Sequence, residues 1–476
     1  MLVRNASIYL LARGVPGVIN LLALAIYTRL LDPSDYGRYI VVLAIVGLAA
    51  LVGFQWLQLG ILRFLPRFAN RENALLSTVA SVYAALILAT LAIGLIVYVV
   101  MAPGPWRSIL PVALFLVCSH AWCELNLQVA SSKIELIRYG LMSGIRAGVA
   151  LGVGIALIAI GYRSAAPLWG AVAGGLIAAL VAGTANWRNV RPRYADPRTL
   201  RQLALYGLPL GATFIFAAGI ASLDRLLLAW LVDNSAAGVY AAGYDLTQSS
   251  LGMIMMVVNL AAYPLTVRVL ESEGVKAARR QLEQQGLLLL AVAAPTAVIF
   301  SLLAANIAQV FLGPEFHVGA ASVIPCIAVS AFILGTKAYY YDLAFQLGER
   351  TASQLWIMLA ASVANLVLNL AWIPEYGVVG AAWAIVTTQA FALVLSIWIG
   401  RRYFAIPLIP SGSAGVLVAA MLMGWTLYLT RGFSGQLKLA GALAIGGLVY
   451  GIGLYAFNVG GSRTAASSIF KKWRST

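Results

Sequence analysis

Eight ionisable side chains lie inside long apolar stretches of the sequence. The basic ones are Arg13, Arg146, Arg225 and Lys337, and the acidic ones are Glu124, Asp224, Asp245 and Asp342. An ionisable group at bilayer depth costs several kcal/mol unless it faces a cavity or a partner, so each is a candidate functional residue. Guanidinium groups match phosphate oxygens bidentately. The basic set therefore predicts a binding site for a phosphate-bearing or otherwise anionic solute, and the carboxylates are candidates for coupling to an ion such as the proton.

Neutral polar residues accompany these charges at helical spacing. Arg13, Gly17 and Asn20 fall on one face of a helix, and Asp245 with Gln248 repeats the pattern further along the chain. Such a stripe on an otherwise apolar helix is typical of the wall of a wet cavity. The side chains that we expect to line this cavity besides the charged ones are Asn20, Gln248, Asn365 and Asn369.

Some of these residues have a plainer interpretation. Asp224 with Arg225, and Lys337 with Asp342, could form static ion pairs between helices. Asn365 and Asn369 could cross-link helices through hydrogen bonds. No acidic residue in their own apolar stretches is placed to neutralise Arg13 or Arg146, so these two arginines are expected to face the cavity.

The sequence gives little support for metal binding, cysteine chemistry or catalysis. His120 and Glu124 are four residues apart and resemble half of a metal site, but the chain has only two histidines. The three cysteines all fall in apolar runs and are expected to be small buried residues. We therefore expect no metal, no cofactor and no catalytic residue. No phosphate-binding P-loop is present, so coupling is expected from ion gradients, the membrane potential or substrate supply.

The amino-acid composition indicates whether this chain resides in water or in a lipid bilayer. Of its 476 residues 62% are hydrophobic and only 10% are charged, whereas an average soluble domain is about 25% charged. Lys and Arg number 32 against 16 Asp and Glu, but the basic residues are dispersed among the apolar runs, which argues against nucleic-acid binding. The composition predicts a protein of the bilayer.

Apolar windows of about 20 residues, enough to cross the hydrocarbon as a helix, recur along the chain. They predict an all-α polytopic membrane protein with fourteen spans. The expected spans are 6–30, 38–62, 75–101, 106–129, 139–161, 166–186, 203–231, 237–266, 286–312, 318–346, 352–373, 377–400, 411–430 and 436–457. No linker could hold a soluble domain, and the charged segment 271–285 is expected to form a short helix on the membrane surface.

Basic residues between the spans predict the topology. With both termini on one side, that side receives 22 of the 32 Lys and Arg and the opposite side receives six, the other four being the buried ones. Because basic loops stay in the cytoplasm, both termini are expected to be cytoplasmic.

The chain also contains an internal repeat. Residues 31–39 (LDPSDYGRY) follow the first span, and residues 232–240 (VDNSAAGVY) follow the seventh, with four identities at an offset of 201. Six spans separate the copies, so both have the same orientation. We expect two pseudo-symmetric six-helix lobes, 1–202 and 203–405, and two added helices with a basic tail in 406–476. Two such lobes suggest a carrier that alternates between inward-open and outward-open states around a site between them.

Several motifs resemble one family of membrane proteins. Residues 27–39 (YTRLLDPSDYGRY) look like the first hairpin of Wzx-type polysaccharide transporters, the flippases for lipid-linked oligosaccharides such as O-antigen units. These belong to the multidrug/oligosaccharidyl-lipid/polysaccharide exporter superfamily. Similar stretches, in the family's order over residues 1–405, are GLPL at 207–210 with Asp224-Arg225, GVYAA at 238–242, and IPEYGVVGAA at 373–382.

The resemblance implies a V-shaped, two-lobed helical body in the bacterial inner membrane, similar to that of multidrug exporters. It implies flipping of an undecaprenyl-pyrophosphate-linked oligosaccharide from the cytoplasmic to the periplasmic leaflet, for O-antigen or exopolysaccharide synthesis. Partners would be this lipid and possible neighbours in the pathway, a polymerase and a chain-length regulator. The family's basic lumen implies that Arg13, Arg146, Arg225 and Lys337 contact pyrophosphate or acidic sugars.

Three alternatives stay open. A lipid II flippase for peptidoglycan would differ mainly in sugar specificity. A cation-drug antiporter of the same superfamily is disfavoured by the buried cations. A membrane scaffold for a polymerase or glycosyltransferase would have no need of arginines in a cavity.

Overall fold

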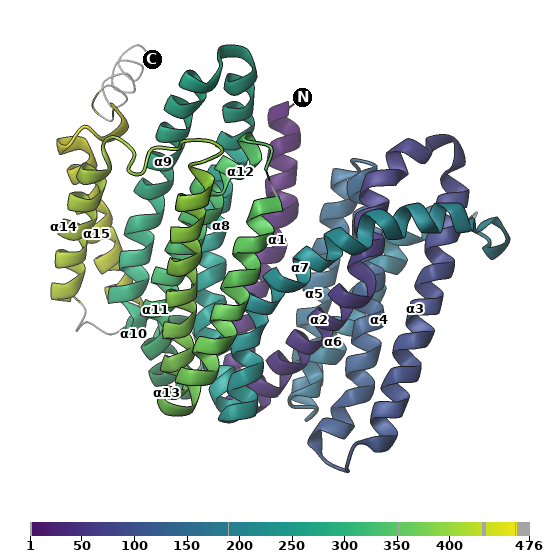
Figure 1. Ribbon diagram of the computed structural model, residues 1–476. Coiled ribbons are helices and arrows are strands. Elements are labelled where there is room, and N and C mark those ends of the chain that lie inside the picture. The colour runs from purple at the N-terminus through teal and green to yellow at the C-terminus, as the bar shows by residue number, and fades with distance from the viewer. Residues whose placement is uncertain (1, 189, 351, 431–434, 462, 464–476) are drawn as a thin grey trace, which may run out of the picture. The chain divides into compact units, whose positions relative to one another are not determined.

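The computed structural model describes residues 2–188, 190–350, 352–430, 435–461 and 463, without the side chains of 2–13, 69, 70, 185, 213, 215–218, 221 and 436. The described chain is helical throughout, with 11 helices long and apolar enough to cross a membrane. Helices α1 (Leu2–Leu30) and α7 (Pro197–Leu231) also coincide with predicted spans, but some of their side chains lie outside the described residues. Helix α13 (Ala352–Gly400) covers two predicted spans, which meet at Gly377. Each of the fourteen predicted spans falls on a helical segment, so the all-α prediction is confirmed (Figure 1).

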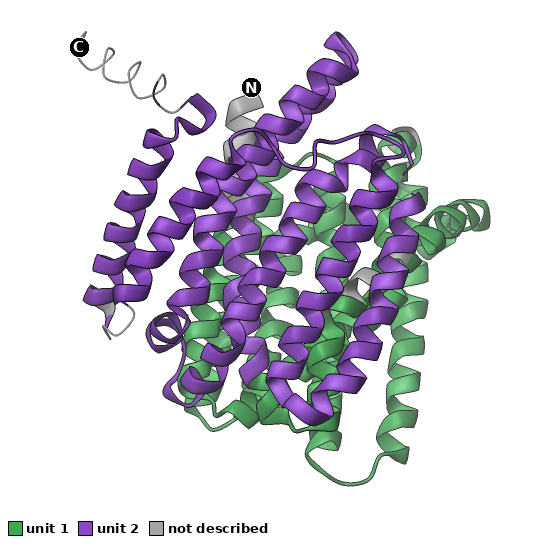
Figure 2. Cartoon of the chain, turned by 60° about the vertical axis from the view of Figure 1, so that its left-hand side comes forward, with its two compact units in different colours: residues 1–238 green, residues 239–476 purple. Residues whose placement is uncertain are grey.

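The chain forms two compact units, residues 1–238 and 239–476 (Figure 2). The helices of the first unit are α1 (Leu2–Leu30), α2 (Pro33–Phe64), α3 (Glu72–Val100), α4 (Pro105–Ser132), α5 (Leu136–Ala159), α6 (Ala165–Gly183) and α7 (Pro197–Leu231). In this unit α5 packs on α1 and α6, and α2 packs on α4 and α7. The predicted lobes, 1–202 and 203–405, are defined by the sequence repeat and not by compactness, so that division stays a prediction.

The second unit contains most of α8 (Asn234–Glu273) and all later helices. These are α9 (Val275–Leu302), α10 (Ala304–Phe311), α11 (His317–Thr336), a π-helical turn (Lys337–Tyr341), α12 (Leu343–Leu347), α13 (Ala352–Gly400), α14 (Ser413–Thr430) and α15 (Gln436–Ala456). Here α11 packs on α9 and α13, and α14 packs on α9 and α15.

Segment 271–285 does not form the separate surface helix expected from its charge. Its residues instead extend α8 and α9, which meet at Gly274. Gly274 has a φ of +84°, a value that L side chains rarely adopt. Because glycine makes this sharp connection possible, the charged residues continue the two long helices.

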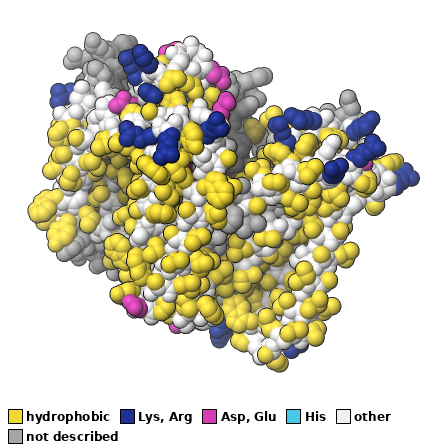
Figure 3. All heavy atoms as spheres, in the orientation of Figure 1, with side chains coloured by type: hydrophobic (Ala, Val, Ile, Leu, Met, Phe, Trp, Pro, Cys, Tyr) yellow, Lys and Arg dark blue, Asp and Glu magenta, His cyan; other side chains and the backbone are white. Residues whose placement is uncertain are grey.

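Apolar side chains cover the lengths of the helices. On α3, for example, Leu88 and Val99 are each 68% exposed, which would be costly in water. Figure 3 shows hydrophobic side chains over the middle of the molecular face, whereas Lys and Arg gather near the ends of the helices. This distribution matches a protein whose solvent is the bilayer.

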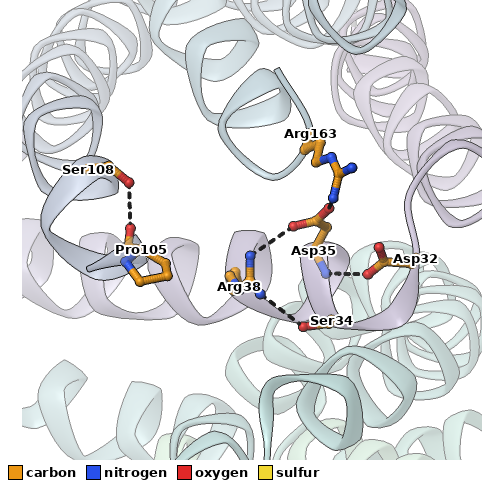
Figure 4. Close-up of polar contacts among 7 residues, drawn as sticks. All are labelled: Asp32, Ser34, Asp35, Arg38, Pro105, Ser108 and Arg163. Atoms are coloured by element: carbon orange, nitrogen blue, oxygen red, sulfur yellow. Dashed lines mark hydrogen bonds and ion pairs between the residues drawn. The ribbon is translucent and has the colours of Figure 1, made fainter. Parts of the chain in front are cut away.

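The two copies of the repeat begin helices in the same way. Asp32 caps α2 by accepting a hydrogen bond from the backbone N–H of Asp35 at 2.8 Å, with Pro33 in the first helical turn (Figure 4). Asp233 likewise accepts from the backbone N–H of Ala236 at 2.7 Å, where α8 begins. An Asp cap satisfies backbone donors that a helix leaves unpaired. The sequence repeat therefore corresponds to a repeated local structure.

Candidate functional site

The first unit encloses a cavity of about 360 Å³. Its wall combines five helices, α1, α2, α4, α5 and α6. The polar residues that line it are Asn20, Tyr39, Glu124, Tyr139, Ser143 and Arg146, and the other lining residues include Pro16, Leu43, Leu127, Ala147, Ala150 and Ala171. Three residues predicted for the site, Asn20, Glu124 and Arg146, thus come together from α1, α4 and α5.

Small residues on α6 hold the helix that carries Arg146. A Cβ at Gly174 would lie 2.4 Å from the backbone oxygen of Arg146, and one at Gly170 would lie 2.3 Å from that of Ala150. Glycine at both positions lets the backbones approach closely, as at many membrane helix interfaces. From the other side, the Tyr27 hydroxyl of α1 donates to the Ala150 oxygen at 3.1 Å. The position of Arg146 is therefore fixed by contacts on two sides of α5.

Arg146 is not the unneutralised cation that its own span suggests. Its Nη1 donates to Glu124 Oε1 at 2.5 Å, and its Nη2 donates to His120 Nδ1 at 2.7 Å. Both partners lie one helical turn apart on α4. The prediction is wrong on this point because the neutralising carboxylate comes from the neighbouring helix and not from the span of Arg146 itself.

His120 and Glu124 do not form half of a metal site in this structure but orient a guanidinium. An arginine always donates, so His120 Nδ1 must accept and the ring proton resides on Nε2. The guanidinium is thereby held between a carboxylate and a neutral imidazole. The Arg146 and Glu124 side chains remain 28% and 30% exposed, so both can still reach a molecule in the cavity.

A second polar cluster lies in the second unit, and the ion pair at its centre is buried. Lys337 Nζ donates to Asp342 Oδ2 at 2.7 Å, and the two side chains are 6% and 3% exposed. Asp342 also accepts from Ser396 Oγ at 2.7 Å and from Gln354 Nε2 at 3.1 Å, both on α13. Lys337 therefore does not line an open cavity here, and the ion-pair interpretation is the one that the structure supports.

The pairing of Lys337 with Asp342 depends on an irregular helix. Residues five apart lie well away from each other around an α-helix, which has 3.6 residues per turn. The chain from Lys337 to Tyr341 is instead a π-helical turn, and the Asp342 N–H bonds to the Lys337 oxygen at 2.8 Å. Such turns occur frequently at functional sites. The wider turn brings positions five apart onto one face.

Asn365 and Asn369 are buried on α13 and do not line an open cavity in this structure. Asn369 Nδ2 donates to the Asn365 backbone oxygen at 2.9 Å, within the same helix. Among the described residues no partner accepts or donates at the Asn365 amide group or at the hydroxyl of buried Thr388. These two lie on the two arms of α13 that join at Gly377, where φ is +55°.

The remaining predicted residues lie elsewhere. The Arg13 side chain falls outside the described residues. Asp224 is buried and Arg225 half-buried on α7, and both have interaction partners. Asp245, which also has a partner, and Gln248 are half-buried on α8 in the second unit.

Sequence reasoning missed several polar residues. Tyr139 and Ser143 lie on α5 at four- and three-residue steps before Arg146, a helical spacing that could have revealed them. Asp35 is a further buried carboxylate, 5% exposed, which accepts from Arg38 at 3.1 Å and lies 4.0 Å from Arg163 (Figure 4). It was overlooked because it stands in a connection between spans.

Comparison with known proteins identifies the family. The polysaccharide biosynthesis protein family matches residues 2–270, more than half of the chain. The chain belongs to this family. A membrane protein of Methanocaldococcus jannaschii without an assigned function is 21% identical over 217 residues, which are 44% of this chain and 42% of that protein. The chain thus matches about two fifths of the length of this curated relative.

Solved structures of transporters share the fold of this family member. The lipid II flippase MurJ in an inward-closed conformation has a TM-score of 0.79 at 12% identity, covering 94% of this chain and 98% of that one. An inward-facing multidrug transporter of the MATE family has a TM-score of 0.58 at 14% identity, covering 83% and 98%. The expected fold is confirmed, and these likenesses concern the fold alone.

Proposed function

We propose that this protein flips an undecaprenyl-pyrophosphate-linked oligosaccharide from the cytoplasmic to the periplasmic leaflet of a bacterial inner membrane. The product would supply O-antigen or exopolysaccharide synthesis, through possible partners such as a polymerase and a chain-length regulator. Transport would proceed by alternating access, with both termini in the cytoplasm. No step of this process requires a catalytic residue or a cofactor.

The supporting observation is a cavity with polar walls inside a bilayer protein of the polysaccharide biosynthesis family. Its helices are apolar toward their surroundings, yet six polar side chains line the cavity. A charged or hydroxyl-rich headgroup cannot cross hydrocarbon without such polar partners. A lipid-linked substrate fits this arrangement because its tail can stay in the bilayer while its headgroup enters the cavity.

Arg13 and Arg225 are the cations that we propose as contacts for pyrophosphate. Arg146 and Lys337 would first have to separate from the carboxylates that pair with them in this structure, and Arg225 would have to exchange the contact that it makes here. Glu124, Asp224, Asp245 and Asp342 are the proposed ion-coupling residues, and each would have to exchange its present contacts during transport. The coupling ion itself can be identified by varying the gradient in reconstituted vesicles.

The test of this function uses the Arg13→Ala variant in the native host. We expect lipid-linked oligosaccharide to accumulate where a membrane-impermeant glycosidase added to spheroplasts cannot reach it. Expression and membrane insertion should persist, and Arg188→Ala, in an exposed connection, is the matched control. Normal surface polysaccharide in Arg13→Ala would refute the role of this arginine.

Lipid II flipping for peptidoglycan is the alternative substrate. Proteoliposomes containing the wild-type protein can be supplied with either lipid-linked oligosaccharide or lipid II, each carrying a label on the headgroup. We expect the first lipid to become accessible to the external reagent at least tenfold faster. The reverse preference would overturn the proposed substrate and leave the flippase class in place.

A further inference from the structure

We infer that the cavity of the first unit binds a neutral sugar residue of the headgroup through its hydroxyls, and not the pyrophosphate. This inference rests on the proposed function and assigns one part of the substrate to one cavity. At about 360 Å³ the cavity lies within the range of about 300–1,000 Å³ typical of small-molecule sites.

The charge of the cavity wall favours a neutral ligand. Among the described side chains that line it, Arg146 and Glu124 are the charged ones, and they form a direct pair at 2.5 Å. A pyrophosphate would have to displace Glu124 from the guanidinium and would then lie beside that carboxylate. Two negative charges side by side repel each other strongly, so the Glu124 carboxylate disfavours binding of an anion in this cavity.

The same pair suits a hydroxyl-bearing ligand. A sugar hydroxyl donates and accepts at once, so it can donate to the carboxylate while accepting from the guanidinium. Hydrogen bonds to charged groups are the stronger ones. Arg146 keeps a fixed orientation because His120 accepts from its other nitrogen at 2.7 Å.

Other polar groups extend this pattern along the wall. Among the described residues, none is hydrogen-bonded to the side chain of Asn20 or Ser143, so both have donors and acceptors to offer. Tyr39 and Tyr139 add aromatic rings, which combine an apolar surface for the C–H faces of a sugar with a polar hydroxyl. The wall thus holds the mixture of groups that recognises a sugar.

The test is binding of free sugars to the purified full-length protein in nanodiscs, measured by saturation-transfer difference NMR. The probes are galactose, N-acetylglucosamine, rhamnose and glucuronate, with inorganic pyrophosphate followed separately by ³¹P line broadening. We expect a signal from at least one neutral sugar and a weaker signal from glucuronate. Absence of a signal from all neutral sugars would overturn the inference.

The Glu124→Gln variant distinguishes a sugar site from a pyrophosphate site, because it should weaken binding of the first ligand and strengthen binding of the second. If the cavity binds sugar, loss of the charged acceptor should weaken the neutral sugar about tenfold. If Arg146 binds pyrophosphate, removal of the competing carboxylate should instead strengthen pyrophosphate binding. The Arg146→Gln variant should lose sugar binding and leave pyrophosphate broadening unchanged.

Controls distinguish binding from folding and from the wider function. Glu315→Gln, on an exposed connection of the second unit, is the matched control and should change neither signal. Where Glu124→Gln lowers the thermal stability, Ser143→Ala provides a second test in which one uncharged hydroxyl is removed. If pyrophosphate binding depends on Arg146, the sugar site is refuted. If the wild-type protein still flips its substrate in that case, the proposed function is unaffected.

Discussion

At the scale of single residues, ion pairs decide what the buried charges can do. A charge that already has a partner has less to offer a ligand, because binding must first replace the existing contact. Arg146 retains access to its cavity despite its pair, whereas Lys337 is enclosed with Asp342 and two further hydrogen-bond donors. The two residues, equivalent in sequence reasoning, therefore differ in setting: Arg146 is accessible from a cavity, whereas Lys337 is enclosed.

The enclosed pair gives a stability prediction. Replacing Lys337 by Met leaves the Asp342 carboxylate buried without its cation, which should cost about 3–5 kcal/mol. The double variant Lys337→Met with Asp342→Leu removes both charges and should recover much of this loss. Thermal unfolding of the purified proteins measures the difference.

Translocation by the double variant is the second readout for this cluster. If the pair is structural, the double variant should flip substrate at close to the wild-type rate once its stability is restored. A stable double variant that fails to flip would show instead that the pair takes part in transport.

At the scale of elements, close helix contacts require glycine at defined points. A Cβ at Gly37 would lie 1.7 Å from the Asn234 oxygen, and one at Gly238 would lie 2.3 Å from the Pro33 oxygen. The repeat offset of 201 residues relates Gly37 to Gly238 and Pro33 to Asn234, so each contact is the counterpart of the other. The helix starts at 33–37 and 234–238 thus meet in a reciprocal contact between their backbones.

This contact predicts opposite effects for two substitutions in the same helix. Gly37→Ala should destabilise the protein by about 1–3 kcal/mol, because the backbones must separate to admit a methyl group. Gly47→Ala has nothing within 4 Å of the new Cβ and should stabilise α2 by about 0.5–1 kcal/mol. Chemical denaturation of each variant measures both effects, and equal stability of the two would contradict the contact.

At the scale of the whole molecule, the topology follows from charge and from this contact together. Because residues 33–37 touch 234–238, the connections before α2 and α8 lie at the same end of the helices. Arg29 and Arg38 are the basic residues beside the first of these connections, whereas the far ends of α2 and α7 carry more of them: Arg63, Arg67, Arg71, Arg188, Arg191, Arg193, Arg198 and Arg201. The positive-inside rule then predicts that both connections are periplasmic.

Reporter fusions test this assignment. A fusion after Arg201 should be active only with a cytoplasmic reporter, and one inserted within 232–239 only with a periplasmic reporter. Alkaline phosphatase and a fluorescent protein that matures only in the cytoplasm distinguish the two sides. Cytoplasmic activity at 232–239 would require a different number of spans before that point.

The helices and their order can be predicted from the amino-acid sequence. In hydrocarbon every backbone N–H and C=O must be satisfied within the segment, so an apolar run of about 20 residues has little choice but to be a helix. Proline, glycine and Asp caps then mark the ends, as Asp32 and Pro33 do for α2. The repeat, the membrane solvent and the family could be predicted from such local signals.

Which buried charges neutralise one another depends on the tertiary structure. Glu124 and Arg146 lie 22 residues apart on different helices, and their contact depends on how α4, α5 and α6 pack. Lys337 and Asp342 meet because one turn is π-helical, a local irregularity that apolar periodicity does not reveal. Side-chain pairing depends on distances of a few ångströms between segments, which residue spacing along a single helix does not determine.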